Sequence, residues 1–128
     1  MSNSKNRKTK PGFVYLIHCE LKNPELKEFT AIKYGCTSLP VQKRMVRLRY
    51  EKKSTHIIKG ILCYAHVKQR YEAENKIKWG IQDHGLGGMD ETIILDADSG
   101  ETIQSVIQRF SDLVRTNYGS DTVVCSNK

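Results

Sequence analysis

The chain has 128 residues, of which 38% are apolar and 27% are charged, and its formal net charge is +7. This length fits one domain with a modest core and a large wet surface. The charge favours polyanionic partners, either nucleic acid or an anionic membrane surface. No apolar run approaches the roughly 20 residues that a membrane-spanning helix needs, and the N-terminus lacks the hydrophobic segment of a secretory signal. We therefore expect a soluble, cytoplasmic (intracellular) protein with no membrane partner.

The first expected segment is a basic leader over residues 1–11, which contains no acidic residue and should be disordered. A strand follows over residues 13–19, with apolar side chains on both alternating faces, as in a central strand. A short polar turn leads to a second strand over residues 29–35, which Gly35 closes. So short a connection predicts an antiparallel hairpin.

The segment TSLPVQKRMVRLRYEKK predicts a helix of about three turns. Ser38 is the expected N-cap, and Val41, Met45 and Leu48 form one apolar stripe. Basic side chains fill the rest of this segment against a single acid, Glu51. They are Lys43, Arg44, Arg47, Arg49, Lys52 and Lys53. Such a cluster is often only solvated surface, but together with the net charge it predicts contact with nucleic acid.

The second half of the chain alternates strands and helices. Residues 55–67 are rich in β-branched side chains and predict a third strand, in which Gly60 marks a bulge or a break. Helical periodicity returns over residues 68–83, a short strand is expected over 91–97, and a last helix over 101–117.

The resulting order is β-β-α-β-α-β-α, which predicts an α+β domain with a small antiparallel or mixed sheet flanked by helices. The opening hairpin disfavours a doubly wound parallel sheet. We assign this single domain to residues 12–118 and expect a loose tail over 119–128, with the alternative that Val123-Val124 pairs with a sheet edge.

The cysteines form no close pair of the C-x-x-C type, which disfavours a zinc site. They are Cys19, Cys36, Cys63 and Cys125. A metal site built from His18-Cys19 and Cys63 with His66 fits no structural zinc pattern. Reduced thiols in ordinary packing are the better interpretation.

Four polar side chains fall on faces that should be dry. Tyr15 and Lys33 each share a strand face with apolar residues, and Arg44 lies on the apolar stripe of the first helix. Glu74 shares a helix face with isoleucines at i+3 and i+7. Isolated buried charges are strongly disfavoured, so we expect the four groups to converge or to reach a cleft. Taken singly, each also has a structural explanation: a core tyrosine, a snorkelling lysine and a buried ion pair.

The motifs GFVYLI and IKYGCT, with an arginine in the next helix and a glutamate in a later one, resemble the GIY-YIG nuclease superfamily. The resemblance is strongest to small phage and bacterial members whose second motif reads Lys-Ile-Gly, and it covers roughly residues 11–95. It implies that Tyr15 is the tyrosine of the first motif. It also implies that Lys33 occupies the tyrosine position of the second motif and that Gly35 is its glycine.

The same resemblance implies that Arg44 is the helix arginine and that Glu74 binds the metal, with Glu72 as the reserve candidate. His56 falls near a position where some members carry a functional histidine. The chain departs from the family pattern in its lysine at the second tyrosine position, in one extra residue before Arg44, and in lacking a match to an asparagine after the glutamate. We predict nucleic-acid contact by the following residues: Lys43, Arg47, Arg49, Lys52, Lys53 and His56.

The resemblance implies hydrolysis of a phosphodiester bond in nucleic acid with one Mg²⁺ or Mn²⁺ ion. We favour DNA as the substrate, and the sequence leaves the choice between DNA and RNA open. Tyr15 would take a proton from water; because a phenol has an unperturbed pKa of about 10, Lys33 would supply a neighbouring cation. Arg44 would hold the scissile phosphate through its fork of donors. Glu74 would ligate the ion, which prefers oxygen and keeps several waters.

Two other classes of function remain open. One is an inactive nucleic-acid-binding module of the same fold, and the other is a small interaction or inhibitor protein. Nothing in the chain identifies a module that reads a long DNA site. A short or branched site, a partner protein or a homodimer would therefore select the target.

Overall fold

The computed structural model describes residues 10–21, 30–51, 56–82, 92–95, 102–118 and 123–125. Its elements in chain order are β1 (Gly12–Leu21), β2 (Thr30–Thr37), α2 (Val41–Glu51), β3 (His56–Val67), α3 (Arg70–Gln82), β4 (Thr92–Leu95), α4 (Ile103–Tyr118) and β5 (Val123–Cys125). The fold is α+β, as the sequence predicts, and one further strand, β5, follows the predicted order.

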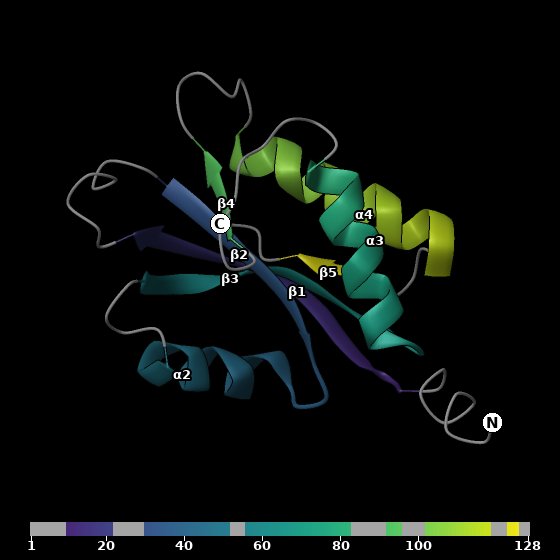
Figure 1. Cartoon of the computed structure of the whole chain (residues 1–128), viewed down its shortest axis with the longest axis horizontal. Helices are drawn as coiled ribbons and strands as arrows, with labels where there is room; N and C mark the ends of the chain where they lie inside the picture. The colour runs from purple at the N-terminus through teal and green to yellow at the C-terminus, as the bar shows by residue number, and fades with distance from the viewer. Residues whose placement is uncertain are drawn as a thin grey trace.

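The described strands form one sheet in the order β4-β2-β1-β3-β5 (Figure 1). All neighbouring strands are antiparallel. β1 lies at the centre and pairs with β2 as the predicted hairpin. The prediction that Gly35 closes β2 is wrong, because the ladder with β1 continues until Thr37 lies opposite Phe13.

β3 runs along the other side of β1, and its register shifts twice. Gly60 lies opposite His18, and one residue of β3 is skipped on each side of this stretch, Leu62 and Lys59. These irregularities confirm that the region around Gly60 is a bulged part of the strand.

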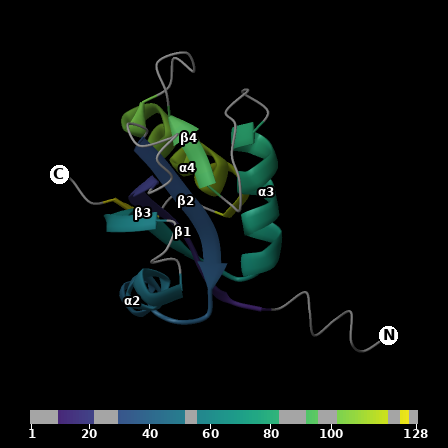
Figure 2. The ribbon, with the colours of Figure 1, turned by 60° about the vertical axis from the view of Figure 1, so that its left-hand side comes forward.

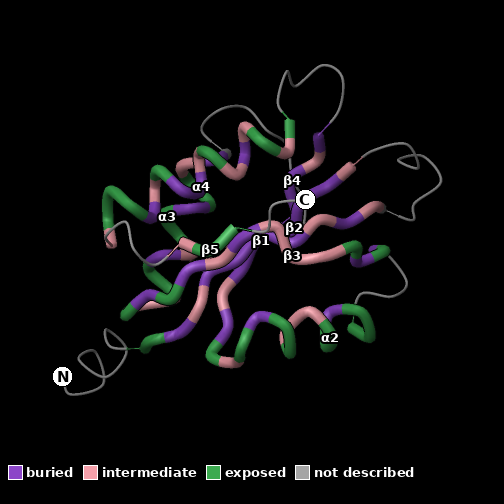
Figure 3. The backbone as a smooth tube through the Cα atoms, turned by 180° about the vertical axis from the view of Figure 1, so that it is seen from behind, coloured by how far each residue is buried: buried purple, intermediate pink, exposed green. Residues whose placement is uncertain are grey.

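The sheet is covered on both faces (Figure 2). Residues of β1 alternate between the two layers. Val14 and Leu16 pack in the larger core with α3 and α4, while Tyr15 and Ile17 pack in a smaller core with α2. The strands at the centre of the sheet are therefore buried along most of their length (Figure 3).

The apolar stripe predicted for the first helix packs against the sheet. Val41 and Leu48 of α2 are buried, and Met45 packs beside them. The start of the helix differs from the prediction, because Pro40 rather than Ser38 precedes it. The Pro40 carbonyl accepts hydrogen bonds from the N–H groups three and four residues later, at 3.0 and 3.1 Å.

α4 begins with a reciprocal cap. The Thr102 hydroxyl accepts from the Ser105 N–H at 3.1 Å, and the Ser105 hydroxyl accepts from the Thr102 N–H at 2.8 Å. Each bond satisfies an N–H group that the helix itself leaves without a partner. Val106, Phe110 and Val114 then bury the predicted face.

The tail differs in part from the prediction. Val123 and Val124 belong to β5, which pairs with Cys63–Ala65 of β3, so the alternative of pairing with a sheet edge is confirmed. The rest of the expected tail, and residues 1–9 of the expected leader, lie outside the described residues. In the described part of the chain, no helix combines the length and the apolar character needed to cross a membrane.

Candidate functional site

Tyr15 and Arg44 meet between the sheet and α2. Alternation along β1 turns Tyr15 toward α2, where its side chain is 1% exposed. Arg44 lies on the inward stripe of α2, four residues before the buried Leu48. Its Nε–H group donates a long hydrogen bond of 3.4 Å to the Tyr15 hydroxyl oxygen. The structure therefore brings two of the four predicted site residues into direct contact.

Gly35 leaves the space that the Tyr15 phenol occupies. The two residues are opposite each other on β1 and β2. A β-carbon at position 35 would lie 2.5 Å from the Tyr15 hydroxyl oxygen and 2.8 Å from the ring carbon that bears it. Any larger residue would displace the phenol, so the glycine of the second motif shapes the position of the tyrosine of the first.

Lys33 lies on the same sheet face, two residues along β2 from Gly35. Its side chain is 2% exposed, and its backbone pairs with Ile17 of β1 and Thr92 of β4. In an antiparallel ladder, Tyr15 and Lys33 are diagonal neighbours, with α-carbons roughly 7–8 Å apart. Lys33 is thus close to the phenol in the sheet, as the sequence predicts.

The charge of Lys33 also acts on Cys19, another member of this face. Burial raises the pKa of the Cys19 thiol to about 11, while the nearby Lys33 ammonium and a backbone hydrogen bond from Lys33 partly oppose the rise. The thiol is therefore neutral near pH 7 and behaves as packing rather than as a nucleophile.

Glu74 approaches from the opposite layer. It lies on α3, and its Oε1 atom accepts a hydrogen bond of 3.4 Å from the Cys36 thiol of β2. The predicted inward face of this helix is confirmed, since Ile77 and Ile81 are buried and Glu74 is half-buried.

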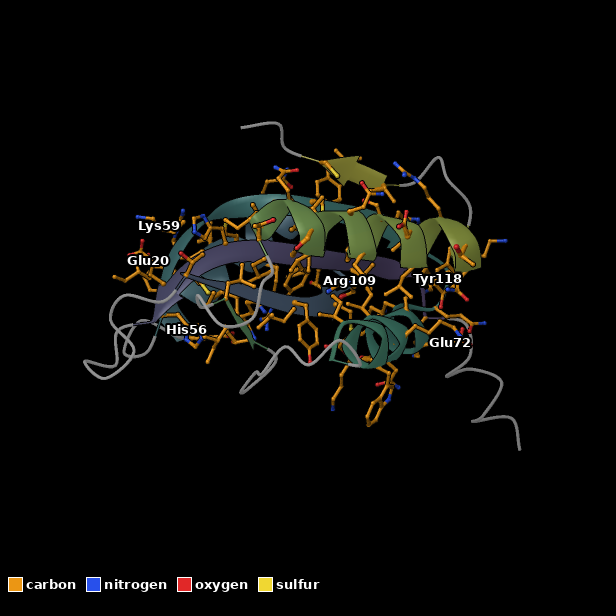
Figure 4. The ribbon with its side chains drawn as sticks, turned by 90° about the horizontal axis from the view of Figure 1, so that it is seen from above. Glu20, His56, Lys59, Glu72, Arg109 and Tyr118 are labelled. Carbon is orange, nitrogen blue, oxygen red and sulfur yellow. The ribbon has the colours of Figure 1, made fainter. Side chains whose placement is uncertain are left out.

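Glu72, the reserve candidate, turns toward α4 instead. Burial, and then the neighbouring Glu72 carboxylate, raises the pKa of Tyr118 to about 12. Figure 4 shows Glu72 and Tyr118 together at one end of the sheet, whereas His56 lies at the other. The two glutamates of α3 thus serve different neighbours, and Glu74 is the one that reaches β2.

The two halves of the site are linked through one edge of the sheet. β4 pairs with β2 only at residues 30–33, so no described strand covers the outer side of β2 at residues 34–37. Gly35 and Cys36 are consecutive on this edge and point to opposite faces. Tyr15 meets the first of them and Glu74 the second. The phenol and the guanidinium therefore lie at one face of this end of β2, and the carboxylate lies at the opposite face.

Arg44 has a second partner, which the sequence analysis did not assign to it. Its Nη1 atom lies 3.3 Å from Oε1 of Glu51, two turns later on α2. The two side chains are 26% and 49% exposed, so this ion pair is at the surface and weak. One end of the guanidinium thus faces the phenol and the other faces solvent.

The predicted nucleic-acid contacts fall into three groups. Lys43, Arg47 and Arg49 are exposed on α2, next to the half-buried Arg44. Lys52 and Lys53 lie outside the described residues. His56 differs from the prediction, because it is 6% exposed and its Nε2 atom lies 3.2 Å from the Thr92 hydroxyl. His56 is therefore buried beside Thr92 and is not one of the exposed side chains.

Within the described ranges, no three histidine, cysteine or acidic side chains cluster as a ligand set for a metal ion. Mg²⁺ is commonly held by one or two carboxylates, water and substrate phosphates, so it does not require such a cluster. The half-buried carboxylate of Glu74 supplies an oxygen of the kind that this ion prefers.

Three features of the site escaped sequence reasoning. They are the Cys36 thiol beside Glu74, the Glu51 carboxylate beside Arg44, and the close approach of Gly35 to Tyr15. Glu51 carried the clearest signal, as the single acid in a basic helix.

Comparison with family models, with curated proteins and with solved structures finds no match to this chain.

Proposed function

We propose that the chain is a metal-dependent endonuclease of the GIY-YIG type, acting on DNA in preference to RNA. The observation that carries this proposal is the contact of Arg44 with the Tyr15 hydroxyl at 3.4 Å, directly over the glycine of the second motif. Two residues assigned to one active site by motif resemblance alone are in contact although they come from a strand and a helix 29 positions apart.

Tyr15 would act as the general base that takes a proton from the attacking water. A guanidinium at hydrogen-bonding distance stabilises a phenolate relative to the neutral phenol. The Lys33 ammonium, diagonal to Tyr15 across the hairpin, adds positive charge on the same face. Both cations would oppose the cost of placing a phenolate at this buried position.

Arg44 would also hold the scissile phosphate. A guanidinium has five donors in a fixed fork, and the Nε group that faces Tyr15 leaves the Nη side directed toward the surface. A phosphate binding there would replace the weak contact with Glu51. Exposed cations on α2, Lys43, Arg47 and Arg49, would attract the backbone toward this point.

Glu74 would hold the divalent ion, Mg²⁺ or Mn²⁺. When bound there, the ion would offset the negative charge that develops on the leaving oxygen. The Cys36 thiol, which donates to Glu74, would keep the carboxylate oriented along the edge of β2.

A second function is a nucleic-acid-binding module without catalysis, and one observation favours it. Tyr15 and Lys33 are 1% and 2% exposed, so neither meets solvent directly. In such a module, the contact between Arg44 and Tyr15 would serve packing alone.

Intracellular location and formation of a homodimer also stay predictions. Sedimentation or light scattering would test the homodimer.

The deciding experiment is a cleavage assay on a panel of single-stranded, duplex and branched DNA and matched RNA. We expect cleavage with Mg²⁺ or Mn²⁺ that stops in EDTA and is lost in Arg44→Ala while the melting temperature is kept. Binding without cleavage of any substrate would leave the binding module as the function. Affinity that does not fall with added salt would contradict both functions, because phosphate contacts are strongly salt-dependent.

A further inference from the structure

Exposed aromatic side chains form a row on the outer surface of α3. Tyr71 and Trp79 are 54% and 61% exposed, and Asn75 lies between them at spacings of four residues. Residues at i, i+4 and i+8 follow one another along a helix surface. We call Tyr71, Asn75 and Trp79 the α3 aromatic row. Large aromatic side chains are usually buried, so two exposed rings on one helix surface form a candidate docking surface.

The row borders the candidate site. Tyr71 lies three residues before Glu74 and Lys78 four residues after it, so both are its surface neighbours on the helix. The far flank of α3 packs on α4, because a β-carbon at Gly80 would lie 2.6 Å from Leu113. The row therefore occupies the solvent side of α3, between Glu74 and that flank, and α3 forms the outside of its layer in Figure 2.

Each ring of the row carries a cation. The Arg70 guanidinium lies 4.6 Å from the centre of the Tyr71 ring, and the Lys78 ammonium lies 5.7 Å from the centre of the Trp79 ring. Arg70 is itself anchored by a hydrogen bond of 2.8 Å to the Pro11 carbonyl. A ring has two faces, and the large exposed fractions of Tyr71 and Trp79 show that the cations cover only part of them.

Alternating rings and cations match the chemistry of single-stranded nucleic acid. Flat rings stack on bases irrespective of sequence, and basic groups beside them contact the phosphates. A paired duplex offers few free base faces to such rings, because its bases are already stacked on each other. Tyr71 and Trp79 are eight residues apart, about 12 Å along the helix. This distance corresponds to about three to four stacked nucleotides at 3.4 Å each.

We propose that the α3 aromatic row binds an unpaired strand of nucleic acid, whose bases stack on Tyr71 and Trp79. One part of the inference rests on the proposed function. If Glu74 belongs to a nuclease site, the α3 aromatic row beside it selects substrates with a single-stranded segment, such as a flap or an overhang, over blunt duplex. The partner is identified by charge and stacking together, since a protein partner for this surface would have to be acidic as well as apolar.

The protein carries its own reporter, because Trp79 is the single tryptophan of the chain. In EDTA, titration with a 12-nucleotide single strand should quench the Trp79 emission and reach saturation. A 12-base-pair blunt duplex, or polyphosphate of equal charge, should quench it far less. Binding of the labelled strand without a change in Trp79 emission would overturn the proposal, and so would equal quenching by polyphosphate or the absence of any binding at low salt.

Variants separate stacking from charge. Tyr71→Ala and Trp79→Ala should each weaken single-strand binding by about fivefold or more, since base–aromatic stacking contributes about 1–3 kcal/mol per base. Trp79→Phe should restore most of the affinity. The matched control is Tyr50→Ala, which removes a 72% exposed ring from α2 on the other side of the sheet and should change binding less than about twofold.

Failure of this inference differs from failure of the nuclease. Strand binding through Trp79 with no cleavage of any substrate would support the docking surface and contradict the nuclease function. Metal-dependent cleavage of blunt duplex, with rates unaffected by Tyr71→Ala and Trp79→Ala, would keep the nuclease and overturn the docking surface. Emission quenched by an acidic protein but not by the single strand would assign the row to a protein partner.

Discussion

The space around single atoms decides how the site is built, and Gly35 is the clearest case. Its neighbour Tyr15 is fixed on one side by the Arg44 guanidinium and on the other by the missing β-carbon. Buried side chains are packed at the density of crystals, so one added methyl group displaces its neighbours. The glycine of the second motif is therefore required by packing around the phenol.

Gly35→Ala tests this geometry. The added methyl group should push the Tyr15 hydroxyl away from Arg44 and lower the free energy of unfolding by about 1–3 kcal/mol, the usual effect of overpacking. Thermal unfolding would show a fall of about 2–8 °C per kcal/mol. Gly60→Ala is the matched control, because a β-carbon there meets nothing within 4 Å. Equal effects of the two substitutions would contradict the account.

Glu51→Gln tests the availability of Arg44. Removing the carboxylate 3.3 Å from Nη1 should free the guanidinium for phosphate and tighten nucleic-acid binding at low salt. We expect an increase of about two- to fivefold, consistent with about 0.5–1 kcal/mol for a surface ion pair. Glu20→Gln makes the same change of charge beside Lys59, at the far end of the sheet from Glu72 and Tyr118 (Figure 4). An equal gain in affinity from Glu20→Gln would show that the effect comes from the change in net charge and not from Arg44.

At the scale of elements, local patterns predicted most of the structure. Two apolar faces in residues 13–19 indicated a central strand, and β1 is central. The stripes of Val41 with Leu48, and of Val106 with Phe110, predicted which helix faces are buried. The predicted end of β2 at Gly35 and the predicted N-cap at Ser38 were wrong, because both depend on backbone hydrogen bonds that residue periodicity does not encode.

The edge strand β5 can be tested chemically. Cys125 lies opposite Cys63 in the β3–β5 ladder, and opposite residues of antiparallel strands have α-carbons about 4.5–5.5 Å apart, within disulfide range. With diamide as the oxidant, the two thiols should lose two protons and two electrons to it and form a Cys63–Cys125 disulfide. Burial raises the pKa of Cys63, so the exposed Cys125 should react first. Peptide mapping should find this bridge in preference to any bridge to Cys19.

The contact between α3 and α4 predicts a loss of stability in alkali. The pKa of Tyr118 is raised from 10.0 to about 12 by burial and by Glu72. Below pH 10 the Tyr118 phenol is neutral in the folded and in the unfolded state, so its contribution to the free energy of unfolding is fully present there. Between pH 10 and 12 the phenol ionises in the unfolded chain before it ionises in the folded protein, and this contribution is lost. The melting temperature should therefore fall more steeply over this range in the wild type than in Tyr118→Phe, and Tyr50→Phe should behave as the wild type.

Seen as a whole, the molecule covers the two faces of one sheet with helices, α2 on one face and α3 and α4 on the other (Figure 2). The sequence predicted that Tyr15, Lys33, Arg44 and Glu74 converge, and the structure joins Tyr15 to Arg44. It could not predict that Glu74 comes from the opposite layer and reaches β2 beside Cys36, because the sides on which helices cross a sheet are set by connections between distant segments. His56 was placed with the surface cations for the same reason, since its burial depends on Thr92 in another strand.

The most direct test of the central claim uses the two glutamates of α3. Both are on the same helix two residues apart, but Glu74 contacts β2 and Glu72 neighbours Tyr118. Rates of metal-dependent DNA cleavage should fall by about 100-fold or more in Glu74→Gln, the scale at which loss of one transition-state-stabilising group acts. Glu72→Gln should keep a rate near that of the wild type. Equal rates for the two variants, with both proteins folded, would contradict the assignment of the site.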